Sequence, residues 1–226
     1  MPVDLSGPGL WYATRASGLV TMLMLTLSVV LGVLTVTRFQ TLRWPRFVTL
    51  GLHRNVSLLV VVFLGLHIVS TVLDSYTSIA LADAFIPFLA SYRPLWLGLG
   101  AVGCDLLIAL LITSLIRPRI GVRVWRVLHW LAYACWPAAI AHGLGAGTDS
   151  GRTWVLALTV GCVAAVGVAV MVRLVTAGPV PAVVRVGMAA MLLIVVVLGW
   201  DWLRSGPLSA DWSQRALMGY FHGGGR

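Results

Sequence analysis

Long apolar runs separated by short polar connections dominate the chain. A helix needs about 20 apolar residues to cross the hydrocarbon core of a bilayer, and six runs reach roughly this length. The predicted spans are residues 16–37, 52–73, 95–116, 127–146, 153–175 and 183–203. This pattern predicts an all-α integral membrane protein whose fold is a six-transmembrane-helix bundle.

The segments that flank and connect these spans are more polar. Residues 15–203 form the predicted transmembrane domain, residues 1–14 a short outer segment, and residues 204–226 a polar C-terminal tail that we expect to be mostly poorly ordered. The long connection 74–94 has a moderately apolar middle. We therefore expect this connection to lie at the membrane surface or to re-enter the membrane.

The composition favours the same class of protein. Of the 226 residues, 59% are hydrophobic and 10% are charged, whereas about a quarter of a typical soluble domain is charged. In a soluble protein the net charge of +9 would suggest nucleic acid as a partner. Here the arginines lie mostly between the apolar runs, so we expect the partner to be the lipid bilayer and no nucleic acid.

The three cysteines do not form a recognisable metal or redox motif. All of them lie inside apolar runs, and no CxxC or CxxCH sequence occurs. This spacing argues against a disulfide framework, a zinc site and covalently attached haem.

The arginines predict the orientation of the spans. The first, third and fifth connections carry ten arginines and no aspartate: Arg38, Arg43, Arg46, Arg54, Arg117, Arg119, Arg123, Arg126, Arg173 and Arg185. Arginine and lysine are enriched in cytoplasmic loops of membrane proteins. We therefore expect a multi-pass protein of the plasma membrane with these connections in the cytoplasm and both termini outside.

Two of the predicted spans carry a histidine near each end. His53 and His67 are fourteen residues apart on the second span, and His129 and His142 are thirteen residues apart on the fourth. Both spans run from inside to outside, so His53 and His129 lie at one level, called here the inner pair. His67 and His142, the outer pair, lie roughly 20 Å further out, because an α-helix rises about 1.5 Å per residue.

Histidine is rare and functional inside membranes, and its imidazole is a good ligand for iron. Two axial histidines suit a haem that transfers electrons rather than one that binds oxygen. Two haems at the two levels would provide a path for electrons across most of the membrane. Thirteen residues fall short of a whole number of helical turns, so we expect a kink near Cys135-Trp136-Pro137 that re-aims His142.

Other classes of function remain open at this point. The histidines are equally compatible with a haem-binding sensor or assembly subunit that has no turnover of its own. A transporter whose histidines bind protons or metal ions is a further alternative. The fifth histidine, His222, lies in the polar tail and is expected to be solvated.

The histidine spacing resembles that of the ferric reductase-like transmembrane domain superfamily. That superfamily includes ferric reductases, NADPH oxidases and the haem-binding membrane subunit of a bacterial periplasmic methionine sulfoxide reductase. The segments Thr14-Arg15-Ala16-Ser17-Gly18 and Trp125-Arg126-Val127-Leu128-His129 are also similar to the family, and the resemblance covers about residues 10–175. It implies transmembrane electron transfer through two b-type haems ligated by the four histidines of the inner and outer pairs.

The resemblance also implies what this chain lacks. Ferric reductases and NADPH oxidases usually continue into a cytoplasmic domain that binds flavin and NADPH, but this chain has no GxGxxG motif and no such domain. We therefore expect an oxidoreductase membrane subunit with no flavin or NAD site. Its donor is expected to be quinol or a separate flavoprotein, and its acceptor a periplasmic reductase, ferric iron or oxygen on the outer side.

Arginines near the histidines are candidates for binding the anionic propionates of haem. Arg54 and Arg126, together with Arg46, are nearest to the inner pair in sequence, and Arg15, Arg93 and Arg152 are candidates at the outer level. Each of them is equally compatible with setting the topology or binding lipid headgroups. Asp105 lies within the third predicted span, where we expect it to form a hydrogen bond with a neighbouring helix rather than to carry protons.

Overall fold

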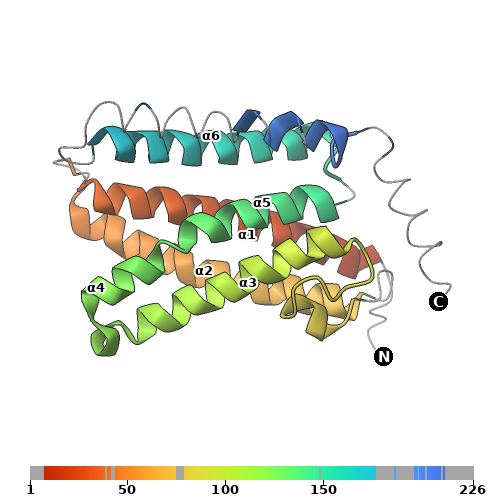
Figure 1. Cartoon of the computed structure of the whole chain (residues 1–226), viewed down its shortest axis with the longest axis horizontal. Helices are drawn as coiled ribbons and strands as arrows, with labels where there is room; N and C mark the ends of the chain where they lie inside the picture. Colours follow the sequence, from red (N-terminus) through yellow and green to blue (C-terminus); the bar gives the residue numbers. More distant parts are fainter. Residues whose placement is uncertain are drawn as a thin grey trace. The chain divides into compact units, whose positions relative to one another are not determined.

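The computed structural model describes residues 8–38, 40–41, 44–74, 79–147, 149–176, 186, 196–197, 199–201, 203–209 and 211. The regular structure within these residues is helical (Figure 1). The helices are α1 (Pro8–Val36), α2 (Arg46–Leu73), the 3₁₀ helix η1 (Leu81–Ala84), α3 (Pro94–Leu115), α4 (Arg117–His129), α5 (Ala132–Ala146) and α6 (Thr153–Thr176).

Four of the described helices are long and apolar enough to cross a membrane, namely α1, α2, α3 and α6. They correspond to the first, second, third and fifth predicted spans. Helix α1 begins at Pro8, well before the predicted start at residue 16. A proline is well placed at the start of a helix, because its missing N–H would have no partner in the first turn.

The fourth predicted span, 127–146, is not one continuous helix. Helix α4 ends at His129, and α5 begins at Ala132 and has only 15 residues. At the break, the N–H groups of Trp130 and Leu131 bond to carbonyls three residues earlier, at 3.2 and 3.0 Å, which is the tighter 3₁₀ pattern. The interruption lies before the kink that was predicted near Pro137, which is inside α5.

The sixth predicted span, 183–203, lies mostly outside the described residues. The same holds for residues 1–7 and for most of the tail 204–226. The six-span bundle and these flanking segments therefore stay predictions.

The arginine-rich third connection, which was predicted to be a loop, forms helix α4. Its residue Gly121 has φ 79° and ψ 158°, so two helical pieces meet there at an elbow. A positive φ of this kind is readily adopted only by glycine. None of the α4 residues is buried.

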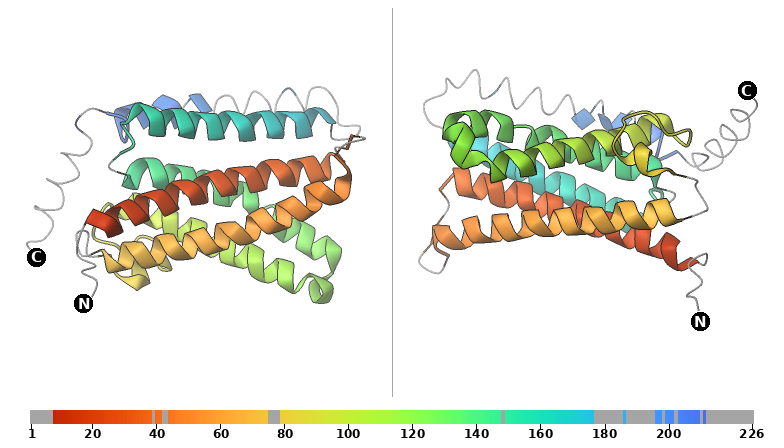
Figure 2. Two further views of the ribbon diagram at one scale, coloured as in Figure 1. Left: turned by 180° about the vertical axis from the view of Figure 1, so that it is seen from behind. Right: turned by 90° about the horizontal axis from the view of Figure 1, so that it is seen from below.

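The chain divides into two compact units, and helices α1 and α2 contribute to both. The first unit comprises Met1–Leu25 and Ser57–Gly147, and the second Thr26–Val56 and Thr148–Arg226. In the first unit, the first part of α1 runs beside the last part of α2, while α3 leads through α4 back to α5 (Figure 2). The second unit contains the end of α1, the start of α2 and α6.

The core of the first unit joins four helices. Its buried centre consists of Leu25 of α1, Val60 of α2, Leu110 of α3 and Cys135 of α5. The thiol of Cys135 donates a hydrogen bond to the carbonyl of Gly103 at 3.3 Å. Val60 is seven residues from each histidine of α2, so apolar packing occupies the level between them.

Candidate functional site

The two histidines of the outer pair come together in the first unit. The ring centroids of His67, on α2, and His142, on α5, are 6.2 Å apart, and the ring planes make an angle of 80°. The structure therefore brings together the two histidines that the sequence places at this level.

His67 is held against the first part of α1. Its Nδ1 lies 2.9 Å from the carbonyl oxygen of Thr14. Since a carbonyl can only accept a hydrogen bond, Nδ1 carries the proton. One turn later on α1, a β-carbon at Gly18 would lie 3.1 Å from the imidazole ring. The ring therefore occupies the space that a side chain at this position would need.

His142 is held against α3 in the same way. Its Nδ1 donates to the carbonyl of Trp96 at 2.9 Å. A β-carbon at Gly100, four residues later, would lie 2.5 Å from the same nitrogen. The close approach of the ring to α3 thus requires glycine at this position.

His53 repeats the arrangement in the second unit. Its Nδ1 donates to the carbonyl of Ser28 at 2.9 Å, and the Ser28 hydroxyl is 3.4 Å from the same nitrogen. A β-carbon at Gly32 would lie 3.3 Å from the ring. We call this combination, a backbone carbonyl with a glycine four residues later, a histidine seat.

The seats have a chemical consequence for the three imidazoles. In a neutral imidazole one nitrogen carries the proton and the other carries a lone pair. With Nδ1–H committed to a carbonyl, Nε2 is the nitrogen that is able to bind a metal. Such outer hydrogen bonds fix the tautomer and the orientation of a ligating histidine.

The register of α3 against α5 follows from three contacts. The guanidinium of Arg93 donates to the carbonyl of Gly145, His142 bonds to Trp96, and Cys135 bonds to Gly103. From one contact to the next, the residue on α5 moves back by three positions and then by seven. The residue on α3 moves forward by the same numbers of positions. The two helices are therefore antiparallel with one constant register.

His129 is placed differently from the other three histidines. It is the last residue of α4, and its ring stacks on that of Trp125, with the centroids 4.7 Å apart and an interplanar angle of 27°. His129 belongs to the first unit and His53 to the second. The pairing of the inner histidines therefore stays a prediction.

The candidate propionate arginines have different environments. Arg54 on α2 and Arg126 on α4 are both exposed, each close in sequence to a histidine of the inner pair. Arg93 is half-buried at the start of α3. Burial lowers the pKa of its guanidinium, Tyr92 raises this pKa in part, and the charge of Arg15 lowers it further. Positive charge therefore gathers near the outer pair, since Arg15 directly follows Thr14.

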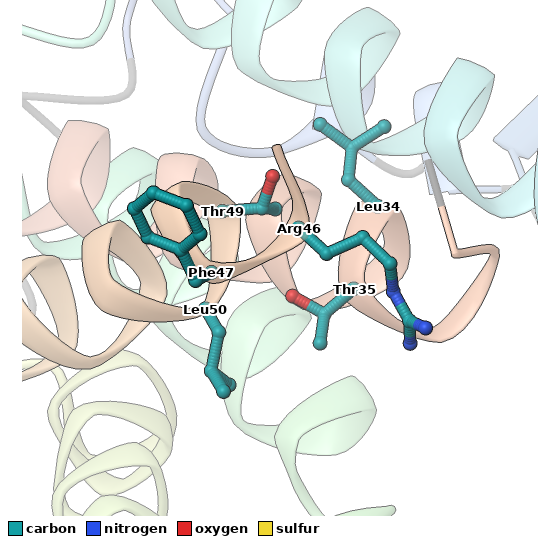
Figure 3. Close-up of a pocket in the computed structure, with 6 residues that line it drawn as sticks. All are labelled: Leu34, Thr35, Arg46, Phe47, Thr49 and Leu50. Carbon is teal, nitrogen blue, oxygen red and sulfur yellow. The ribbon is translucent and has the colours of Figure 1, made fainter. Parts of the chain in front are cut away.

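A shallow hollow of about 170 Å³ lies where α1 ends and α2 begins (Figure 3). The indole N–H of Trp44 donates to the hydroxyl of Thr49, one of the lining residues, at 2.9 Å. The lining consists of Leu34, Thr35, Arg46, Phe47, Thr49 and Leu50. None of the four predicted histidine ligands belongs to it, whereas Arg46 is one of the candidate propionate arginines.

No group of three or more histidine, cysteine or acidic side chains that could hold a metal ion occurs within the described residues. The outer pair alone would leave a bare metal ion with only two protein ligands. Asp105 is exposed on α3, and the hydrogen bond predicted for it stays a prediction.

The seats were not predicted from the sequence, although the sequence contains a signal for them. Gly18 and Gly32 on α1 are fourteen residues apart, the same spacing as His53 and His67 on α2. In the sequence alone, these glycines look like ordinary helix-packing residues. Glycines of the spans that face open space, such as Gly51 and Gly65, look the same in the sequence.

The helices define a class of protein, and the match to one family model identifies a family within this class. The regular structure of the described residues is helical, and their long apolar helices are those of a multi-pass membrane protein. Residues 17–140, more than half of the chain, match the model of the family described as "Ferric reductase like transmembrane component". The chain belongs to this family, which indicates a role in transmembrane electron transfer. Neither a curated protein nor a solved structure was found to match the chain.

Proposed function

We propose that this protein carries electrons across the membrane through two b-type haems, each ligated by two histidines. His67 and His142 hold the outer haem, and His53 and His129 hold the inner one. Electrons enter from quinol or a separate flavoprotein and leave to an acceptor on the outer side, a periplasmic reductase or ferric iron. The haems supply the redox chemistry, and the protein supplies the ligands and an apolar path.

The observation that carries this proposal is the hydrogen bond from Nδ1 to a backbone carbonyl at His53, His67 and His142. It leaves Nε2 of each ring with its lone pair. The separation of the outer rings supports the same proposal. His67 and His142, whose ring centroids are 6.2 Å apart, would hold the iron of the outer haem through their Nε2 atoms.

The number of protein ligands favours haem over a bare metal ion. A transporter site for a metal ion would need three or four protein ligands, and the outer pair offers two imidazoles. A haem would take only two ligands from the protein, and His67 and His142 would supply them. The outer arginines, Arg93 and Arg15, have the charge to bind haem propionates there, and Arg54 and Arg126 are proposed for the same role at the inner level.

The test is the visible spectrum of the purified protein before and after reduction with dithionite. We expect a Soret band and the bands of low-spin, bis-histidine haem. His142→Ala should remove part of this spectrum, whereas His222→Ala, which changes the histidine of the tail, should leave it intact. A protein without a Soret band would contradict the proposal. A haem that stays reduced in the presence of every candidate acceptor would favour a sensor or assembly subunit instead.

A further inference from the structure

The fourth histidine has no seat on α3. His129 lies thirteen residues before His142, and Ala109 lies thirteen residues after Trp96. If α4 and α5 were one unbroken helix, the register that joins His142 to Trp96 would therefore place His129 opposite Ala109. The residue four after Ala109 is Thr113 rather than glycine. The hydroxyl of Thr113 donates to the carbonyl of Ala109 at 2.7 Å. The carbonyl of Ala109 therefore already accepts a side-chain hydrogen bond, and the Thr113 side chain stands at the position that glycine has in the seats.

His129 makes a ring contact within α4. Trp125 and His129 are four residues apart, a spacing that places two side chains on the same face of a helix. The rings are 4.7 Å apart and stacked at 27°. The indole therefore lies flat along the imidazole, and a rotation of the imidazole out of this plane would lose the contact.

Trp125 is itself fixed from two sides. Its indole N–H donates to the hydroxyl of Ser114 in the last turn of α3, at 3.3 Å. The guanidinium of Arg117 lies over the indole ring, 4.4 Å from its centroid. The elbow at Gly121 separates Arg117 from Trp125 in α4. Ser114 and Arg117 thus contact the indole of Trp125 from two sides.

We infer that Trp125 is the positioning residue of His129 and replaces the seat that orients each of the other three histidines. The inference rests on the proposed function, because a defined ring orientation matters only if Nε2 of His129 binds the inner haem. One consequence is an asymmetry between the haems. Both ligands of the outer haem are oriented by backbone carbonyls, whereas one ligand of the inner haem depends on an aromatic side chain.

The experiment compares Trp125→Leu, Trp125→Phe and Trp130→Leu by redox titration and low-temperature electron paramagnetic resonance of both haems in the full chain. Trp130 is adjacent to His129 but exposed, and its ring lies 5.4 Å from that of Tyr133. We expect Trp125→Leu to shift the midpoint potential and the g-values of one haem and to leave the other unchanged. Trp125→Phe, which keeps a stacking ring, should restore most of the wild-type signal, and Trp130→Leu should resemble the wild type.

Ser114→Ala provides a second test that leaves both rings intact. Removal of the acceptor of the indole N–H should shift the same haem in the same direction by a smaller amount. Wild-type signals of both haems in Trp125→Leu, or equal shifts in Trp125→Leu and Trp130→Leu, would overturn the inference while two haems remain bound. If Trp125→Leu does not accumulate, an unchanged Ser114→Ala protein would overturn it. The absence of haem from the wild-type protein would instead contradict the proposed function.

Discussion

A β-carbon on Gly100 would lie 2.5 Å from Nδ1 of His142, closer than side-chain atoms pack. The imidazole therefore fills the space in which any other residue at position 100 would place its side chain. The distance is 3.1 Å between Gly18 and His67 and 3.3 Å between Gly32 and His53. The seats thus tie the positions of three histidines to the packing of α1 and α3.

Gly100→Ala should displace His142 from its seat. Insertion of an extra carbon into a packed site costs about 1–3 kcal/mol, so we expect the chain to retain one haem about ten- to a hundredfold more weakly. Haem content per purified chain measures this loss. Gly103→Ala, on the same helix as Gly100, is the matched control, because its β-carbon would be 3.8 Å from the nearest atoms, which belong to α5. Equal haem content in the two variants would contradict the role of the seat.

Gly18→Ala and Gly32→Ala should have milder effects on two different haems. The new carbons would lie at 3.1 and 3.3 Å from the rings, where a shift of a few tenths of an ångström relieves the contact. We expect Gly18→Ala to change the midpoint potential of the outer haem and Gly32→Ala that of the inner haem. Two variants that shift the same component of the redox titration would show that the seats do not serve separate haems.

Gly145→Ala should destabilise the outer end of α3 and α5. A β-carbon there would lie 1.9 Å from the ring of Trp96, whose carbonyl accepts the hydrogen bond of His142. We expect a loss of about 1–3 kcal/mol in stability, seen as a lower melting temperature in detergent. Gly143→Ala, two residues earlier on α5, meets nothing within 4 Å and serves as the control. Similar melting temperatures for both variants would contradict this packing.

Helix α4 should lie on the cytoplasmic side and the α5–α6 connection outside. Cysteine labelling with a membrane-impermeant maleimide on intact cells measures this, with Arg119→Cys as the inner probe and Gly151→Cys as the outer one. The native cysteines Cys104, Cys135 and Cys162 are buried, so the background should be low. We expect only Gly151→Cys to react, and the reverse pattern would invert the proposed direction of electron flow.

The hydrophobic pattern was sufficient to predict four long apolar helices. The length of an apolar run is a local property that survives folding. The α1, α2, α3 and α6 helices therefore appear where this pattern places them, with α1 and α2 starting earlier than predicted. The sequence also places His67 and His142 at one level, and the structure brings their rings to 6.2 Å of each other. Their role as ligands stays a prediction.

The break after His129 and the helix α4 could not be predicted in the same way. Neither Trp130 nor Leu131 is a glycine or a proline, so no residue there marks the 3₁₀ turn between α4 and α5. The histidine seats depend on which carbonyl faces which imidazole. That relationship belongs to the register between helices and is not visible along any one of them.

The haem content of the purified chain tests the central claim most directly. Haem quantification against protein concentration should give two haems per chain in the wild type, one in His67→Ala and one in His53→Ala. Since each variant removes one ligand from a different pair, the double variant should retain none. A wild-type protein without haem, or variants with the full wild-type content, would contradict two haems held by the inner and outer pairs.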